Sequence, residues 1–269
     1  MRLSIQHETR YDYGEKADYS VQRLRLVPRP HDGQSIVRWD VEAPGMKTAA
    51  RYRDAFGNQV YLVSCPLDHR GTIVRASGVV ETRERSGIVS GLVEPAPAWI
   101  YGRTTERTEP DERVREIASR VAEADPLEQM HDLMSLVADA IEYEPGATDH
   151  STTAAEALSL GRGVCQDYAH AFISAARLLE RPARYVTGYL LVGPGGHHEA
   201  HHAWAEVHLP GLGWVGFDPS NRVCPTEQYV RLAAGLDAGQ AAPVEGRRRG
   251  PGDEALAVAV RVQQQSSSQ

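Results

Sequence analysis

The chain has 269 residues, of which 41% are hydrophobic and 24% are charged, and its mean hydropathy is −0.42. This composition is typical of a globular protein with room for two domains or one large one. The formal net charge of −7 argues against a broad surface for phosphate groups, so no nucleic-acid partner is expected.

The three cysteines, Cys65, Cys165 and Cys224, are an odd number and lie far apart, which indicates a reducing compartment rather than a disulfide framework. The N-terminus lacks an apolar stretch of signal-peptide length, and no later stretch is apolar enough to span a bilayer. We therefore expect a cytoplasmic protein without a membrane partner.

Residues 1–95 are expected to form a β-rich domain. Apolar and polar side chains alternate over residues 3–13 and 21–27, as they do in half-buried strands. Further strand-like runs cover residues 35–41, 58–64 and 71–82. Because no strong helical pattern separates these runs, they predict an antiparallel sandwich.

Residues 96–110 are rich in Pro and polar side chains and indicate a linker. Helical periodicity begins in the predicted core, residues 111–235. From the apolar stripes and capping residues we expect helices over residues 112–124, from Pro126 to about Ile141, and from Thr153 to about Leu160.

The C-terminal region is expected to contribute strands and a tail. Residues 236–262 are interpreted as a strand extension, and residues 263–269 are too polar to pack, which predicts a disordered tail. The basic run Arg247-Arg248-Arg249 lies among Gly and Pro residues and indicates a solvated loop.

The stretch from Gly161 to His170 holds the strongest candidate for chemistry. Two glycines precede Cys165, and apolar residues then recur at helical spacing until Pro182. Cys165 is therefore placed in the first helical turn, where unpaired backbone N–H groups and the helix dipole favour a thiolate. An isolated cysteine is nevertheless most often a small buried core residue.

After Pro182 the apolar pattern changes to a period of two and predicts an antiparallel meander over residues 183–192, 201–209 and 214–218. His202 lies near the start of the second strand, and Asp218 ends the third. A tight turn between antiparallel strands brings these two ends together. A nucleophilic thiol needs such a base, and the base needs a third group that fixes its tautomer.

His198, Glu199 and His202 also fit the H-E-x-x-H pattern of zinc proteases. That pattern requires a helix, on which both histidines share one face. On a strand the two histidines lie about 13 Å apart, at about 3.3 Å per residue, which is too far for one zinc ion. We therefore expect no metal and no cofactor, and we keep a zinc hydrolase as the less favoured alternative.

Four motifs follow one another in the second half of the chain: Gly163–His170, Arg181–Tyr189, His202–Val207 and Gly213–Asn221. In this order they resemble the nucleophile helix, the following strand, the histidine strand and the aspartate strand of the transglutaminase-like superfamily of papain-like thiol enzymes. Residues 7–13, 24–29 and 54–58 resemble the N-terminal β domain of its bacterial members. The resemblance implies an α+β fold, with a papain-like core of helices and an antiparallel sheet behind a β-sandwich-like domain.

Carried over to this sequence, the resemblance implies that Cys165 attacks an amide or ester carbonyl and forms a thioester. His202 is then expected to pair with the thiolate and protonate the leaving amine, and Asp218 to orient His202. The backbone N–H of Cys165 is expected to bind the oxyanion, with Gln166 an open candidate for the second donor.

The expected activity is that of a cysteine protease or amidase on a peptide or protein substrate. Hydrolysis is favoured over transfer of the acyl group to an amine. The alternative from another class is a non-catalytic module that binds a peptide or protein partner in the same cleft.

Overall fold

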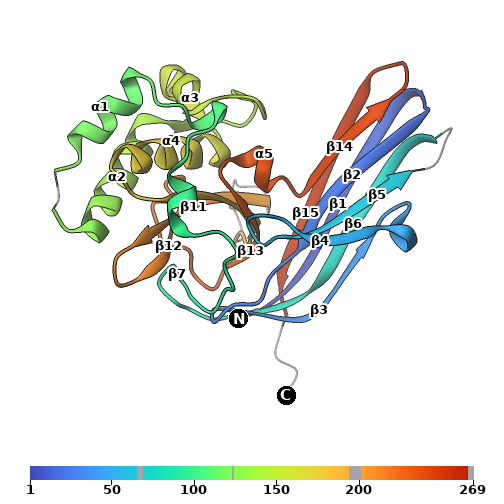
Figure 1. Ribbon diagram of the computed structural model, residues 1–269, viewed down its shortest axis with the longest axis horizontal. Helices are drawn as coiled ribbons and strands as arrows, with labels where there is room; N and C mark the ends of the chain where they lie inside the picture. Colours follow the sequence, from blue (N-terminus) through green and yellow to red (C-terminus); the bar gives the residue numbers. More distant parts are fainter. Residues whose placement is uncertain (66–68, 123, 194–200, 266–269) are drawn as a thin grey trace.

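The computed structural model describes residues 1–65, 69–122, 124–193 and 201–265 and shows two parts packed side by side (Figure 1). Long strands form a β-sandwich, and a second sheet with helices forms the other part. The expected α+β class with mostly antiparallel sheets is confirmed. Within the described ranges, no helix is long and apolar enough to cross a membrane.

Two four-stranded antiparallel sheets form the sandwich, in the orders β15-β1-β6-β3 and β14-β2-β5-β4. The first sheet contains β1 (Arg2–Ala17), β3 (Gln34–Glu42), β6 (His69–Thr82) and β15 (Glu254–Gln264). The second contains β2 (Tyr19–Val27), β4 (Ala50–Arg53), β5 (Gln59–Cys65) and β14 (Val244–Arg249). The five predicted N-terminal strands are present. The sequence pattern misses β4 because its four residues are all exposed and show no buried alternation.

Alternation along β1 directs one face of the strand into the sandwich. Leu3 and Ile5 are buried there against Leu24 and Leu26 of β2. The same cluster includes Val230 from the second part of the molecule, so one apolar core runs from the sandwich into the neighbouring sheet. Burial of this kind stabilises the contact between the two parts.

The C-terminal strands complete the sandwich, and this corrects two predictions. Arg247, Arg248 and Arg249 are not a loop, because they lie in β14 and pair with β2. The run is compatible with a strand because β14 is an edge, where charged side chains reach solvent, and the Arg248 guanidinium lies over Tyr13 at 5.0 Å. β15 extends to Gln264, two residues into the expected tail, and residues 266–269 lie outside the described chain.

The second part is built on a five-stranded antiparallel sheet in the order β13-β10-β11-β12-β7. Its strands are β7 (Ile88–Val89), β10 (Ala183–Leu190), β11 (His201–Leu209), β12 (Gly213–Phe217) and β13 (Tyr229–Gly235). The predicted meander is confirmed by the pairing of β10 with β11 and of β11 with β12. The short β7 pairs with β12, so a segment that follows the sandwich strands joins the second sheet.

Helices cover one face of this sheet (Figure 1). They are α1 (Glu112–Arg120), α2 (Pro126–Ala140), α3 (Ala154–Leu160), α4 (Cys165–Leu178) and α5 (Ala238–Ala241). Capping begins three of them where predicted, since Asp111, Asp125 and Thr153 accept backbone N–H groups. α1 ends earlier than expected because Val121 is extended and packs against the core.

Shorter elements fill the connections. They are the 3₁₀ helices η1 (Met46–Thr48), η2 (Ala98–Gly102) and η3 (Glu106–Thr108), and the parallel pair β8 (Glu142–Tyr143) and β9 (Arg162–Gly163). The buried guanidinium of Arg177 in α4 donates to the carbonyls of Tyr101, Ala183 and Leu236 and to Oγ1 of Thr108, at 2.7–2.9 Å. One side chain of α4 thereby fixes the predicted linker against the core.

Candidate active site

The start of α4 is shaped by an acid three residues after its N-cap. The carboxylate of Asp167 accepts the backbone N–H of Val164 at 2.8 Å and the hydroxyl of Thr148 at 2.6 Å. A Cβ atom at Gly163 would lie 2.6 Å from Oδ2 of Asp167, so only glycine leaves room for this cap. Cys165 therefore occupies the first turn of the helix, as the sequence predicted.

His202 and Asp218 meet where the two strands bring them together. β11 and β12 are antiparallel with Ala205 opposite Phe217, which places the start of β11 beside the residue that follows β12. Nε2 of His202 lies 2.6 Å from Oδ2 of Asp218. The two side chains are 1% and 0% exposed, so this ion pair is shielded from solvent.

The partly exposed thiol of Cys165 makes a side-chain hydrogen bond with His202. Because Nε2 of the ring is engaged by Asp218, Nδ1 is the nitrogen left for the bond to the sulfur. Burial alone would lower the pKa of His202, but the Asp218 carboxylate and the bond to Cys165 raise it to about 10. His202 is therefore an imidazolium at neutral pH, placed between a thiol and a carboxylate.

Asp218 is held by a cage of hydrogen-bond donors. Oδ1 accepts the hydroxyl and the backbone N–H of Ser220 at 2.7 and 3.1 Å, and Oδ2 accepts the Asn221 side-chain amide at 2.7 Å. The hydroxyl of Tyr229 donates to Oδ2 at 2.8 Å. Burial alone would raise the pKa of Asp218, but the charge of His202 and these hydrogen bonds keep it below its usual value.

The sequence reasoning missed the cage residues Ser220, Asn221 and Tyr229. For Ser220 and Asn221 a signal exists, since short polar residues just after an aspartate commonly turn back to its carboxylate. Tyr229 comes from β13, which is separated from Asp218 by an irregular segment, so no local pattern indicates the contact.

The structure places three residues near the site, among them Gln166, the open candidate for an oxyanion donor. The side-chain amide of Gln166 donates to the Asp149 carbonyl at 3.3 Å, so this structure engages it there and not as an oxyanion donor. Trp204 stacks near His202, with 6.3 Å between ring centres and 26° between planes. His201 points to the opposite face of the strand and contacts Oγ1 of Thr187 at 3.0 Å.

The zinc alternative gains no support from the described part of the chain. His202 lies in a strand, where its imidazole is engaged by Asp218 and Cys165. No group of His, Cys, Asp and Glu side chains suited to a metal ion occurs among the described residues. His198 and Glu199 lie outside those residues.

A groove of about 730 Å³ runs between the sandwich and the start of α4. On the core side it is lined by Gln166, Tyr185 and His201, and on the sandwich side by His7 and Tyr11. Burial, and to a smaller extent the neighbouring His201, lower the pKa of His7 to about 3, while burial followed by His202 lowers that of His201 to about 4. These two histidines are therefore neutral, and they leave His202 as the charged imidazole of this region.

Family models match both parts of the molecule. Residues 115–219 match the transglutaminase-like superfamily, and residues 3–81 match the bacterial transglutaminase-like N-terminal region. The chain is 30% identical over 276 residues to the uncharacterized protein ML0607 of Mycobacterium leprae, covering 97% of this chain and 98% of that protein. It is 29% identical over 276 residues to the uncharacterized protein Rv2569c of Mycobacterium tuberculosis, covering 91% and 87%.

A solved structure of a candidate cysteine protease from Cytophaga hutchinsonii has the same fold. The TM-score is 0.77 at 18% identity, over 98% of this chain and 90% of that chain. Cys165, His202 and Asp218 all fall within the residues matched to the core model. The chain belongs to the transglutaminase-like superfamily, with the bacterial N-terminal region in front of its core.

Proposed function

We propose that this protein is a cysteine-dependent acyl-transfer enzyme that hydrolyses amide bonds in a peptide or protein substrate. One observation carries the proposal: the imidazole of His202 lies between the Cys165 thiol and the Asp218 carboxylate, in contact with both. A nucleophile, a base and an orienting acid in this order are the minimum set for covalent acyl transfer.

In the reactive state the proton of the Cys165 thiol resides on Nδ1 of His202, which leaves a thiolate beside an imidazolium. In the first half-reaction this thiolate attacks the carbonyl carbon, and the C=O electron pair moves to oxygen. The backbone N–H of Cys165, at the positive end of α4, stabilises this oxyanion. When the intermediate collapses, the C–N bond breaks and Nδ1 of His202 gives its proton to the leaving amine. The product is a thioester on Cys165 and a neutral His202.

In the second half-reaction His202 takes a proton from water, and the resulting hydroxide attacks the thioester carbonyl. The C–S bond breaks, the thiolate leaves, and the protonated His202 again pairs with it. Asp218 remains a carboxylate throughout and stabilises the imidazolium. An amine in place of water would give transamidation, but an amine must first bind, whereas water always reaches the partly exposed Cys165.

The test is turnover of a peptide library in ¹⁸O-labelled water with a biotinylated alkylamine present. Hydrolysis adds one ¹⁸O atom to each new carboxyl group, and transamidation adds the mass of the amine. We expect ¹⁸O-labelled cleavage products. In Cys165→Ala their rate of formation should fall by at least about 10³-fold.

Cys224→Ser is the matched control, because Cys224 is also free and partly buried, whereas the thiol bonded to His202 is that of Cys165. Burial, followed by the charge of Glu84, raises the pKa of Cys224 to about 11, so its thiol is a poor nucleophile. Turnover that survives Cys165→Ala overturns the proposal. Peptide binding without turnover in the wild type points instead to a binding module.

A further inference from the structure

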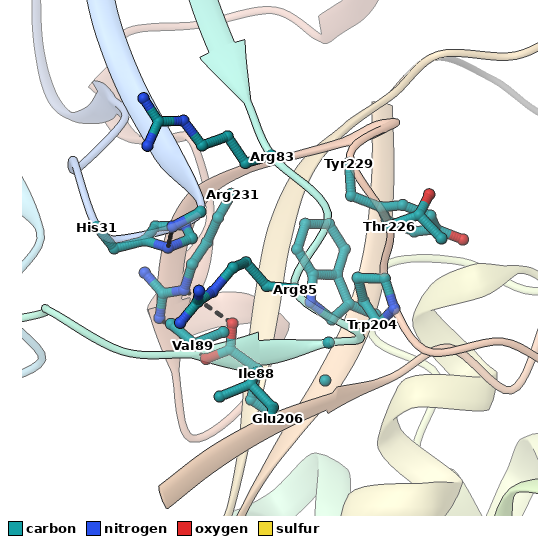
Figure 2. A pocket seen from close by; sticks show the side chains of 14 residues that line it. His31, Arg83, Arg85, Ile88, Val89, Trp204, Glu206, Thr226, Tyr229 and Arg231 are labelled. Atoms are coloured by element: carbon teal, nitrogen blue, oxygen red, sulfur yellow. Dashed lines mark hydrogen bonds and ion pairs between the residues drawn. The ribbon is translucent and has the colours of Figure 1, made fainter. Parts of the chain in front are cut away.

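A second cavity, of about 50 Å³, lies behind the catalytic histidine strand at the junction of the sandwich and the core (Figure 2). It is lined by His31 from the sandwich, by Arg83 and Arg85 from the segment before β7, and by Glu206 and Arg231 from the core sheet. A water molecule needs about 10–15 Å³ of such space, so the cavity holds a few waters or one small polyatomic ion.

Arg231 brings a buried positive charge to this cavity. Its side chain is 5% exposed, and Nε and Nη2 donate to the two oxygens of Glu206 at 2.8 and 3.2 Å. Nη1 has no hydrogen-bond partner among the described residues. It is not one of the fully buried polar atoms that lack a partner, so part of its surface is accessible. Arg231 lines the cavity, and Nη1 is the nitrogen of its guanidinium that Glu206 does not engage.

The single carboxylate in the lining does not neutralise these cations. Glu206 also binds Nε of the fully buried Arg184 at 2.6 Å, and Arg184 is paired in addition with Glu94 at 2.9 Å, so two carboxylates and two arginines form one buried network. Burial alone would raise the pKa of Glu206, but Arg231 and Arg184 lower it to about 2. Glu206 is thus ionised and already saturated with donors.

Arg83 and Arg85 add two more positive charges, and neither makes an ion pair with the described residues. Among the described residues, the one hydrogen bond of the Arg85 guanidinium goes to Oγ of Ser90, at 3.4 Å. The nearby acids are turned elsewhere, since Asp32 accepts from Ser90 and Glu84 accepts from the Ser86 backbone N–H, both at 2.6 Å. Three arginines therefore line the cavity, which has one carboxylate in its lining, and two of them, Arg83 and Arg85, are exposed to solvent.

We propose that this cavity binds a tetrahedral inorganic oxyanion of the phosphate or sulfate class. Nη1 of Arg231 would donate to it from below, and the guanidinium groups of Arg83 and Arg85 would close over it. Guanidinium groups match the geometry of such oxyanions and bind them through charge-assisted hydrogen bonds. Burial and then Arg231 lower the pKa of His31 in the lining to about 4, although Glu206 and Asp32 act in the opposite direction.

The anion site would connect the sandwich to the two aromatic residues, Trp204 and Tyr229, that lie beside the proposed catalytic residues. Trp204 and Tyr229 also line the cavity, and they contact His202 and Asp218 on the other side. A bound anion would hold His31 and the segment before β7 against Trp204 and Tyr229. The proposal does not depend on the proposed chemistry at Cys165, because anion binding is measured without turnover.

The experiment is calorimetric titration and thermal unfolding of the full chain with sodium phosphate, sodium sulfate, sodium acetate and sodium chloride at matched ionic strength. At a phosphate concentration about tenfold above its Kd, we expect the Tm to rise by about 3 °C. Sulfate should act similarly, and acetate and chloride should have little effect.

The variant Arg83→Gln/Arg85→Gln should lose most of this rise, with each single variant between the double variant and the wild type. Arg103→Gln, at an exposed linker arginine, should respond like the wild type. Any of three results overturns the proposal: an equal rise in Tm with chloride, an undiminished rise in Tm in the double variant, or no heat of binding on titration with phosphate. An equal response to acetate overturns the assignment to tetrahedral oxyanions.

Discussion

At the scale of single residues, His202 is charged because its neighbours Asp218 and Cys165 raise its pKa. Its pKa in the folded protein, about 10, lies above the unfolded value of about 6.5. The folded state therefore binds the proton more tightly, and this contribution to stability is complete below about pH 6.5. The stability contributed by His202 is lost as the pH rises through about 10. The pKa of Asp218 is lowered, so the stability contributed by Asp218 is lost only as the pH falls into the acid range.

We expect the free energy of unfolding to fall between pH 7 and pH 10 by on the order of a few kcal/mol. In Asp218→Asn, which removes the main charge that raises the pKa of His202, the fall should be much smaller. Urea unfolding at a series of pH values measures both slopes. Parallel slopes in the two proteins would show that His202 is not a stabilised imidazolium.

Tyr229 gives a test of how the cage around Asp218 acts. Tyr229→Phe removes the 2.8 Å hydrogen bond to Oδ2 and should cost about 1–2 kcal/mol of stability, because a buried carboxylate loses a donor. The rate of Cys165 alkylation by iodoacetamide at pH 6 should fall several-fold, because Asp218 then stabilises the His202 imidazolium, and with it the thiolate, less well. Tyr19→Phe, at a side chain that is 48% exposed, is the control and should change neither quantity.

At the scale of elements, the start of α4 depends on a contact between a glycine and a carboxylate. In Gly163→Ala the new Cβ would meet Oδ2 of Asp167 at 2.6 Å and displace the cap that begins the helix. We expect a loss of about 1–3 kcal/mol and slower alkylation of Cys165. Gly102→Ala is the control, because nothing lies within 4 Å of its added Cβ. Equal unfolding curves for the two variants would disprove the role of the cap.

At the scale of the whole molecule, the two ends of the chain close one sandwich. β15 pairs with β1 from Leu3 to Tyr13, and β14 pairs with β2. Each pairing covers a strand edge that would otherwise present free backbone groups to other chains. The N-terminal region matched by its own family model is therefore completed by residues far outside that match.

A chain shortened by residues 244–269 should therefore lose both edge strands. We expect its Tm to fall by at least about 10 °C, faster hydrogen exchange along β1 and a tendency to aggregate. Removing only residues 266–269, which follow the paired part of β15, is the control and should leave the Tm unchanged. An unaltered exchange pattern in β1 of the shorter chain would contradict this account.

Local patterns were sufficient wherever one side of an element is buried. Thr153 and Asp125 mark helix starts because their side chains accept nearby N–H groups, a contact made within three residues. His202 and Asp218 could be paired because a tight turn determines the register of adjacent antiparallel strands. The strand at Arg247 could not be recognised, because only Val244 and Arg248 of β14 are partly buried, so the strand has no apolar alternation and depends on pairing with β2.

The sequence by itself determined the helix that begins at Cys165 and the β11–β12 pairing that brings His202 to Asp218, since each depends on contacts close along the chain. The contact between Cys165 and His202 joins two elements and depends on how α4 packs on the sheet. Tertiary structure alone decided which side chains surround that site. Tyr229 reaches Asp218 from another strand, and Arg83, Arg85 and Arg231 meet at a cavity although they come from two different parts of the chain. Such long-range contacts depend on how sheets pack together, and no periodicity along a single segment records that packing.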